Sequence, residues 1–127
     1  MTPPVLDLGL LRELEELGDE VVRDIVDEYR FEGGRYVTEI ETAVVHGDVE
    51  RWQRSAHALK GASSSVGAPR VAWVAREIEH ATTIHVDEHV DRLAAAFREA
   101  TAALTRRLTE HQVVTCAPYR RESGPSS

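Results

Sequence analysis

Apolar residues recur every three or four positions along most of the chain, which is the spacing of one face of an α-helix. The first such pattern is short, because Asp7 can cap it and Gly18 closes it. A longer pattern runs from Asp19 to His46 and is interrupted by Gly33-Gly34. Each glycine costs about 1 kcal/mol relative to alanine inside a helix, so we expect a bend or a break of the second helix there.

Three further helices follow, each with its own start or stop signal. Asp48 can cap a third helix that ends at Gly67, and its apolar seam repeats at spacings of four and three. Pro69 lies where the first turn of a fourth helix would begin, a position that tolerates a missing N–H. A short connection over residues 83–86 leads to Asp87, the expected cap of the last helix. The sequence therefore predicts an all-α, up-and-down four-helix bundle with a short extra N-terminal helix.

The length of 127 residues suits one domain with a single core. We place the bundle in residues 1–112 and interpret residues 113–127 as a disordered tail, because they are rich in Ser, Pro and Gly and lack periodicity. No apolar run is long enough for a membrane span, and the N-terminal residues lack the basic region of a signal peptide. We therefore expect a cytoplasmic protein without a membrane partner.

The charge balance narrows the classes of partner. The chain has 22 acidic residues against 15 Lys and Arg, a net charge of −7, which disfavours binding along a nucleic-acid backbone. Lys60 is the single lysine among those 15 basic residues. Two explanations of this scarcity are open. A high-GC coding bias would deplete lysine throughout the chain, or position 60 requires a lysine in particular.

Metal chemistry has little support in the pattern of Cys and His. Cys116 is alone, so no disulfide or thiolate site can form within one chain. His85 and His89 are four residues apart with His80 nearby, but His85 precedes the expected cap at Asp87 and spacing fixes no third ligand. We predict no metal site, and a metal-binding helical bundle is the distant alternative.

The most informative stretch is residues 54–67, RSAHALKGASSSVG. Residues three and four apart share a helix face, so His57 has Arg54 one turn before it and Lys60 and Gly61 one turn after it. His57 is rotated about 100° from Ala56 of the buried seam, towards solvent or the rim of a groove. An exposed imidazole can accept a phosphoryl group if Gly61 leaves the approach open and Lys60 offers a compact cation. The alternative is an ordinary surface histidine, with Gly61 permitting close helix packing.

These residues also carry a family resemblance. The segment Ala56-His57-Ala58-Leu59-Lys60-Gly61, followed by Val66-Gly67-Ala68, resembles the signature of histidine-containing phosphotransfer (HPt) domains. The resemblance covers about residues 5–112. Other positions that fit the family pattern are Tyr29, Ile40, Ala43, Asp48, Val71, Val74, Ile78 and Glu79. One departure is Ser63-Ser64-Ser65, which is more polar than a buried helix end would prefer.

The resemblance implies a phosphorelay intermediate of a two-component regulatory system. His57 would accept a phosphoryl group at Nε2 from the aspartyl phosphate of one receiver domain and pass it to the aspartate of another. Lys60 would lie beside the phosphoryl group, and Gly61 would give clearance. Glu79 would accept a hydrogen bond from the imidazole Nδ1–H and so fix the tautomer. An ordinary solvated carboxylate at Glu79 is the alternative.

Such a phosphoprotein would be a stoichiometric carrier rather than an enzyme. It would need no cofactor, because the receiver supplies Mg²⁺, and its partners would be response-regulator receiver domains and a hybrid sensor histidine kinase. We expect a monomer, with a docking surface formed by Arg54, Ser64, Leu8, Leu11 and Val22. Two rivals stay open: a pseudo-HPt module that binds a kinase or receiver without being phosphorylated, and a domain of a larger hybrid kinase. The starting Met1 favours a free-standing chain over the second rival.

Overall fold

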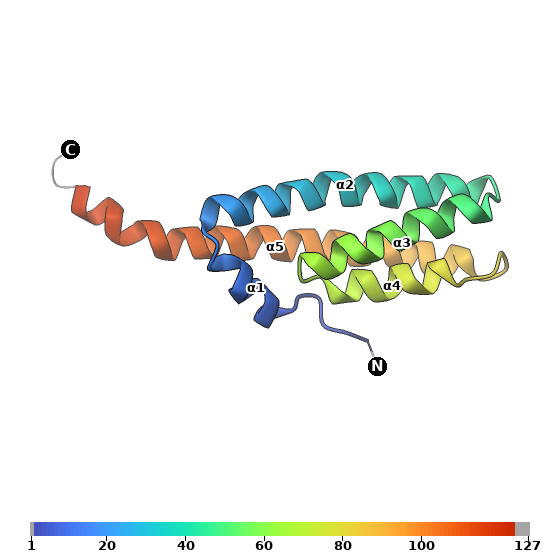
Figure 1. Cartoon of the computed structure of the whole chain (residues 1–127), viewed down its shortest axis with the longest axis horizontal. Coiled ribbons are helices and arrows are strands. Elements are labelled where there is room, and N and C mark those ends of the chain that lie inside the picture. The colour runs from blue at the N-terminus through green and yellow to red at the C-terminus, as the bar shows by residue number, and fades with distance from the viewer. Residues whose placement is uncertain (1, 124–127) are drawn as a thin grey trace.

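The computed structural model describes the backbone of residues 2–123 and the side chains of residues 2–110. Helices α2 to α5 lie lengthwise beside one another, and α1 lies at the end of the bundle where α2 begins (Figure 1). Each long helix packs on two neighbours, since α2 and α4 both contact α3 and α5. No strand occurs in the described residues, and the predicted up-and-down bundle with a short N-terminal helix is confirmed. The helices are α1 (Leu8–Glu15), α2 (Asp19–Val45), α3 (Val49–Ser65), α4 (Pro69–Glu79) and α5 (Val86–Ser123).

Four of the predicted helix signals act as expected. Asp7 accepts a hydrogen bond from the backbone N–H of Leu10 at 3.1 Å, and Asp48 accepts one from Arg51 at 3.2 Å. Gly67 has a φ of +79°, which lets the chain turn sharply between α3 and α4. Pro69 then occupies the first turn of α4. Local signals therefore fix the start of α3 and the turn that joins it to α4.

The expected interruption at Gly33-Gly34 is wrong. Helix α2 is continuous from Asp19 to Val45 (Figure 1). The reason for Gly33 is packing: a Cβ atom there would lie 2.6 Å from a ring carbon of Phe97 on α5. At Gly34 the nearest such contact is an ordinary 3.9 Å. Gly33 thus admits the Phe97 ring between α2 and α5, and the helix tolerates the cost of glycine in return for that contact.

This difference predicts opposite effects for two neighbouring substitutions. Gly33→Ala should destabilise the protein by about 1 kcal/mol or more, because overpacking a fitted core costs about 1–3 kcal/mol and exceeds the gain in helix propensity. Gly34→Ala should stabilise it by up to about 1 kcal/mol. Urea unfolding followed by circular dichroism measures both changes. A Gly33→Ala chain as stable as the Gly34→Ala chain would contradict the packing role of Gly33.

Helix α5 begins earlier in the chain than the sequence predicts, and it extends past the predicted domain boundary. It begins at Val86 rather than after Asp87, because the Val86 side chain is buried in the core at 2% exposure. It continues to Ser123, where the sequence predicted a disordered tail from residue 113. Residues 124–127 and all side chains from residue 111 lie outside the described part of the chain. The domain boundary at residue 112 therefore stays a prediction.

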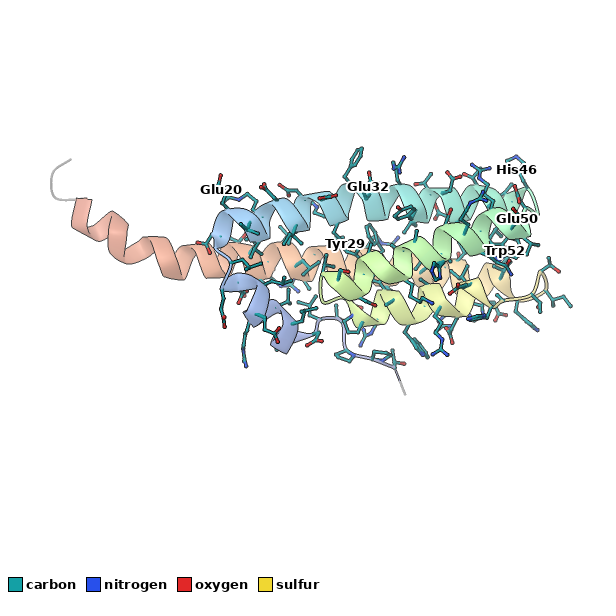
Figure 2. All side chains as sticks on the ribbon, in the orientation of Figure 1. Glu20, Tyr29, Glu32, His46, Glu50 and Trp52 are labelled. Atoms are coloured by element: carbon teal, nitrogen blue, oxygen red, sulfur yellow. The ribbon has the colours of Figure 1, made fainter. Side chains whose placement is uncertain are left out.

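The buried polar side chains of the described residues are Ser55 and Ser63, and Ser63 pairs with the hydroxyl of the buried Tyr29. Tyr29 of α2 lies inside the bundle, as does Trp52 of α3 (Figure 2). The hydroxyl groups of Tyr29 and Ser63 form a 2.7 Å hydrogen bond, and burial raises the pKa of Tyr29 to about 12. Ser63 is thus explained as the partner of a buried tyrosine. The largest fully buried side chains besides Ser63 are Trp52, Ile40, Leu59, Ile78, Leu93, Leu104 and Val71.

Helix α1 is attached to the bundle by polar and apolar contacts. The Arg107 guanidinium of α5 makes two contacts with the Glu15 carboxylate of α1, at 2.8 and 3.0 Å. The backbone N–H of Asp7 donates to the carbonyl of Gly67 at 2.9 Å, and Leu11 packs against Gly67. These contacts hold the N-terminal segment against the α3–α4 turn. Within the described residues, no helix is both long enough and apolar enough to cross a membrane.

Candidate functional site

His57 lies on the exposed face of α3, and 68% of its side chain is accessible. Its backbone position is fixed by the buried residues on either side of it, Ala56 and Leu59, which are 0% exposed. A Cβ atom at Gly61 would meet nothing within 4 Å. Close helix packing therefore does not explain this glycine. The missing side chain instead leaves open the space one turn from the imidazole.

Glu79, at the end of α4, bridges His57 and Lys60. Its Oε2 atom lies 2.8 Å from His57 Nδ1, and its Oε1 atom accepts a hydrogen bond from Lys60 Nζ at 2.9 Å. Because an ionised carboxylate can only accept hydrogen bonds, the neutral imidazole carries its proton on Nδ1. Nε2 is then the nitrogen with the free lone pair. The geometry thus favours an oriented imidazole over a solvated carboxylate at Glu79.

The carboxyl of Glu79 is held in its ionised form. The hydrogen bond from Lys60 lowers the pKa of Glu79 below its ordinary value; partial burial opposes the shift, and the hydrogen bond with His57 adds to it. Because the folded pKa is depressed, the stability from these contacts is present above the ordinary carboxyl pKa and is lost as the pH falls through the lowered value. At neutral pH Glu79 is therefore an anion facing His57 and Lys60.

Sequence reasoning missed the ion pair between Lys60 and Glu79. It treated Lys60 only as a compact cation for the phosphoryl group, but 31% of its side chain is exposed and its ammonium contacts the Glu79 carboxylate. It also missed His80, whose Nε2 lies 4.0 Å from Glu79 Oε1. Both contacts depend on the register of α4 against α3. That register is set by the length and turn geometry of the connecting segment, which helix periodicity alone does not give.

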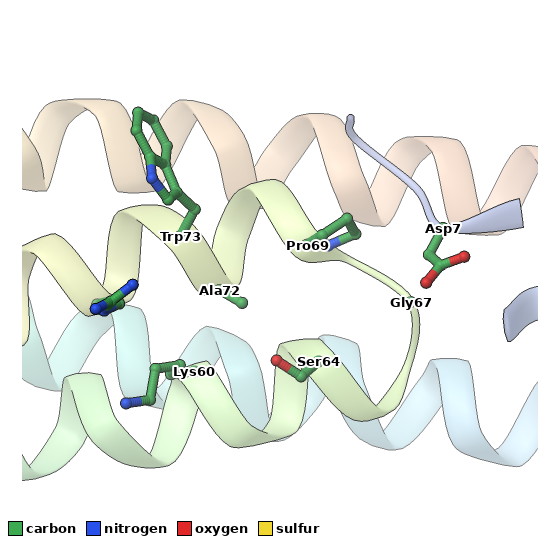
Figure 3. A pocket seen from close by; sticks show the side chains of 8 residues that line it. Asp7, Lys60, Ser64, Gly67, Pro69, Ala72 and Trp73 are labelled. Atoms are coloured by element: carbon green, nitrogen blue, oxygen red, sulfur yellow. The ribbon is translucent and has the colours of Figure 1, made fainter. Parts of the chain in front are cut away.

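A groove of about 380 Å³ runs along α3 and α4 from Lys60 towards the α3–α4 turn. Figure 3 shows Lys60 and Ser64 on one wall and Ala72 and Trp73 on the other, with Asp7 near the far end. Arg76 also lines the groove. The imidazole therefore lies beside a groove that is lined by two cationic side chains, Lys60 and Arg76.

The predicted docking residues divide into two groups. Arg54 is exposed, with its guanidinium 3.7 Å from Glu50 on the same helix, and Ser64 and Leu8 are exposed as well. The prediction is wrong for Leu11 and Val22, which are 3% and 6% exposed. Both side chains belong to the hydrophobic core, because α1 and the first turns of α2 turn their apolar stripes inward. Neither can meet a partner without unpacking the bundle.

The histidines considered for metal binding do not converge. His85 is exposed, while His89 lies 3.6 Å from Glu77 and 3.0 Å from an Arg92 nitrogen. Across the residues that the structure describes, no group of three His, Cys, Asp or Glu side chains is placed to hold a metal ion. The predicted absence of a metal and of any other cofactor stays a prediction.

The fold and the site together place one oriented, exposed imidazole on the surface of a helical bundle. The protein-family model described as Hpt domain matches residues 24–110. The match spans more than half of the chain, and the chain belongs to the Hpt domain family. Hpt domains are phosphotransfer carriers that work with receiver domains and histidine kinases in two-component phosphorelays.

A solved structure supports the fold. The chain is similar to the crystal structure of histidine-containing phosphotransfer protein B from Pseudomonas aeruginosa PAO1, with a TM-score of 0.77 and 21% sequence identity. The similarity covers 86% of this chain and 98% of that chain. A comparison with curated proteins finds no match.

Proposed function

We propose that this chain is a phosphorelay intermediate whose His57 accepts a phosphoryl group from one receiver domain and passes it to another. The observation that carries the proposal is the 2.8 Å contact between Glu79 Oε2 and His57 Nδ1. This contact leaves Nε2 as the nucleophile on a side chain that is 68% exposed. An accessible nitrogen with a fixed tautomer is what transfer between two proteins requires.

In the proposed reaction, the Nε2 lone pair attacks the phosphorus of a receiver aspartyl phosphate. An N–P bond forms while the P–O bond to the aspartate breaks, and the aspartate leaves as a carboxylate with the bonding electron pair. The ring keeps its proton on Nδ1 and gains positive charge, which the Glu79 carboxylate stabilises. Transfer to the second receiver reverses these steps. The receiver supplies Mg²⁺ and its acidic pocket, and this chain supplies an aligned nucleophile.

Lys60 and Gly61 have supporting roles in this proposal. An ammonium group has three donors, so Lys60 can keep one on Glu79 and direct another at a phosphoryl oxygen. Gly61 leaves room for the incoming receiver because nothing lies within 4 Å of its missing side chain. The chain itself is a stoichiometric carrier in this scheme and needs no ATP site.

The docking surface follows from the exposed face of α3. Arg54 lies one turn before His57 and Ser64 lies two turns after it, and both are exposed. Leu8 adds an apolar side chain from α1 that is 47% exposed. We propose that receiver domains, including one from a hybrid sensor histidine kinase, dock over this face.

The test is to incubate the full chain with Mg²⁺ and a panel of phosphorylated receiver domains. The expected result is phosphate on this chain that is labile in acid and stable in base, and that mass spectrometry maps to the peptide containing His57. Return of the label to a second, unphosphorylated receiver would support the two-way transfer. Stable binding of receivers without any label would instead identify an interaction module and overturn the carrier function.

A further inference from the structure

Arg76 stands out among the basic residues near the site. Helices α3 and α4 carry four arginines, and three of them pair with a glutamate: Arg51 with Glu39, Arg54 with Glu50 and Arg70 with Glu99. Arg76 forms no ion pair with any residue that the structure describes. Its exposed guanidinium is thus a cation on the site side of the bundle without a carboxylate partner.

The position of Arg76 links it to the His57 site. It lies one turn before Glu79 on α4, and it lines the same groove as Lys60 and Ser64. Lys60 in turn contacts the carboxylate that holds His57. Residues three apart on a helix share a face, so Arg76 and Glu79 both face the α3 ridge that carries the imidazole.

The charge balance at the site changes when phosphate arrives. Before phosphorylation, Lys60 neutralises Glu79. A phosphoryl group brings about two negative charges, while the ring gains one positive charge that faces Glu79. Lys60 is then shared between the phosphoryl oxygens and Glu79. Guanidinium groups bind phosphoryl oxygens with two parallel hydrogen bonds, which an ammonium group cannot do. Arg76 is the nearby cation that is free to provide them.

We propose that Arg76 is a second phosphoryl-binding residue, which contacts the phosphoryl oxygens on His57 Nε2 from the α4 side of the groove. The proposal rests on the function proposed for His57. In this arrangement Lys60 contacts the phosphoryl group from the side of Glu79, and Arg76 contacts it from the opposite side. No further group is consumed, since Arg76 contributes charge and hydrogen bonds and does not change its covalent state.

The experiment compares Arg76→Gln and Arg76→Lys with Arg98→Gln, each made in the full chain. Arg98 is an exposed arginine of α5, a helix whose backbone packs beside α2 and α4 rather than α3, so its variant carries the same change in net charge away from the site. The phosphoryl donor is phosphoramidate, which releases ammonia and needs no receiver. Rates are measured by mass spectrometry, and the phosphohistidine signal is followed by ³¹P NMR.

We expect Arg76→Gln to take up phosphate about three- to fivefold more slowly than Arg98→Gln, the range for an exposed ion pair. The difference should shrink in high salt, Arg76→Lys should restore part of the rate, and the ³¹P signal should shift in Arg76→Gln alone.

Equal rates and signals for the Gln variants, with normal loading of the unchanged chain, would overturn the role of Arg76 and leave the carrier function standing. A defect confined to transfer from receivers would place Arg76 against the partner and also overturn it. Failure of the unchanged chain to load from any donor would overturn both proposals.

Discussion

A chain carrying His57→Gln is expected to take up no phosphoryl group from any receiver and to remain folded. Glutamine has no nucleophilic nitrogen, because its amide lone pair is delocalised, so the loss should be complete rather than partial. The fold should survive because the His57 side chain is 68% exposed and its neighbours in the core are unchanged. Surface substitutions of this kind change the free energy of unfolding by about 0.5 kcal/mol or less. Radiolabel transfer and thermal melts measure the two properties on the same samples.

The matched control for that experiment is His85→Gln. His85 is also exposed but lies in the connection between α4 and α5, away from the Glu79 contact. This variant should accept phosphate at the rate of the unchanged chain. Label that persists in His57→Gln at a normal level would place the phosphorylated residue elsewhere and overturn the proposed role of His57.

Most of the fold could be predicted from residues that begin or end helices. The caps at Asp7 and Asp48 and the turn at Gly67 depend on hydrogen bonds and dihedral angles within a few residues, so they can be read locally. The interruption expected at Gly33-Gly34 failed because glycine propensity is a local cost, whereas the contact with Phe97 joins residues far apart in the chain.

In the candidate site, too, contacts within one helix could be predicted from the sequence, whereas contacts between helices could not be predicted from spacing. Helical spacing placed His57, Lys60 and Gly61 on one face, and the structure agrees. Spacing could not place Glu79, which lies 22 residues after His57 and meets it through the α3–α4 hairpin; the family resemblance supplied that residue. Nor could spacing separate Leu8, which is exposed, from Leu11, which is buried, because both lie on a short amphipathic helix whose docking angle decides the outcome.

Replacing Glu79 with Ala should slow phosphorylation of His57 by about ten- to a hundredfold, by analogy with the loss of a carboxylate that orients a metal-binding imidazole. Without the 2.8 Å contact at Nδ1, the proton can move to Nε2 and block the nucleophile, and the ring is free to rotate. Lys60 also loses the acceptor that positions its ammonium. Glu79→Gln keeps an oxygen for Nδ1–H but not the charge that stabilises the phosphorylated ring, so its rate should fall between those of the unchanged chain and Glu79→Ala.

Glu77→Ala separates orientation of the imidazole from general loss of an ion pair. Glu77 lies on the same helix and pairs with Arg92 at 2.7 Å and not with His57 or Lys60. Its removal should lower the urea midpoint about as much as Glu79→Ala does, yet leave single-turnover phosphate transfer unchanged. ¹⁵N NMR of the imidazole gives the independent readout, because the neutral His57 ring should carry its proton on Nδ1 in Glu77→Ala and in a mixture of tautomers in Glu79→Ala. Equal transfer rates in the two variants would show that Glu79 stabilises the bundle without orienting His57, and the tautomer of the nucleophile would then have to be set within the complex with the receiver.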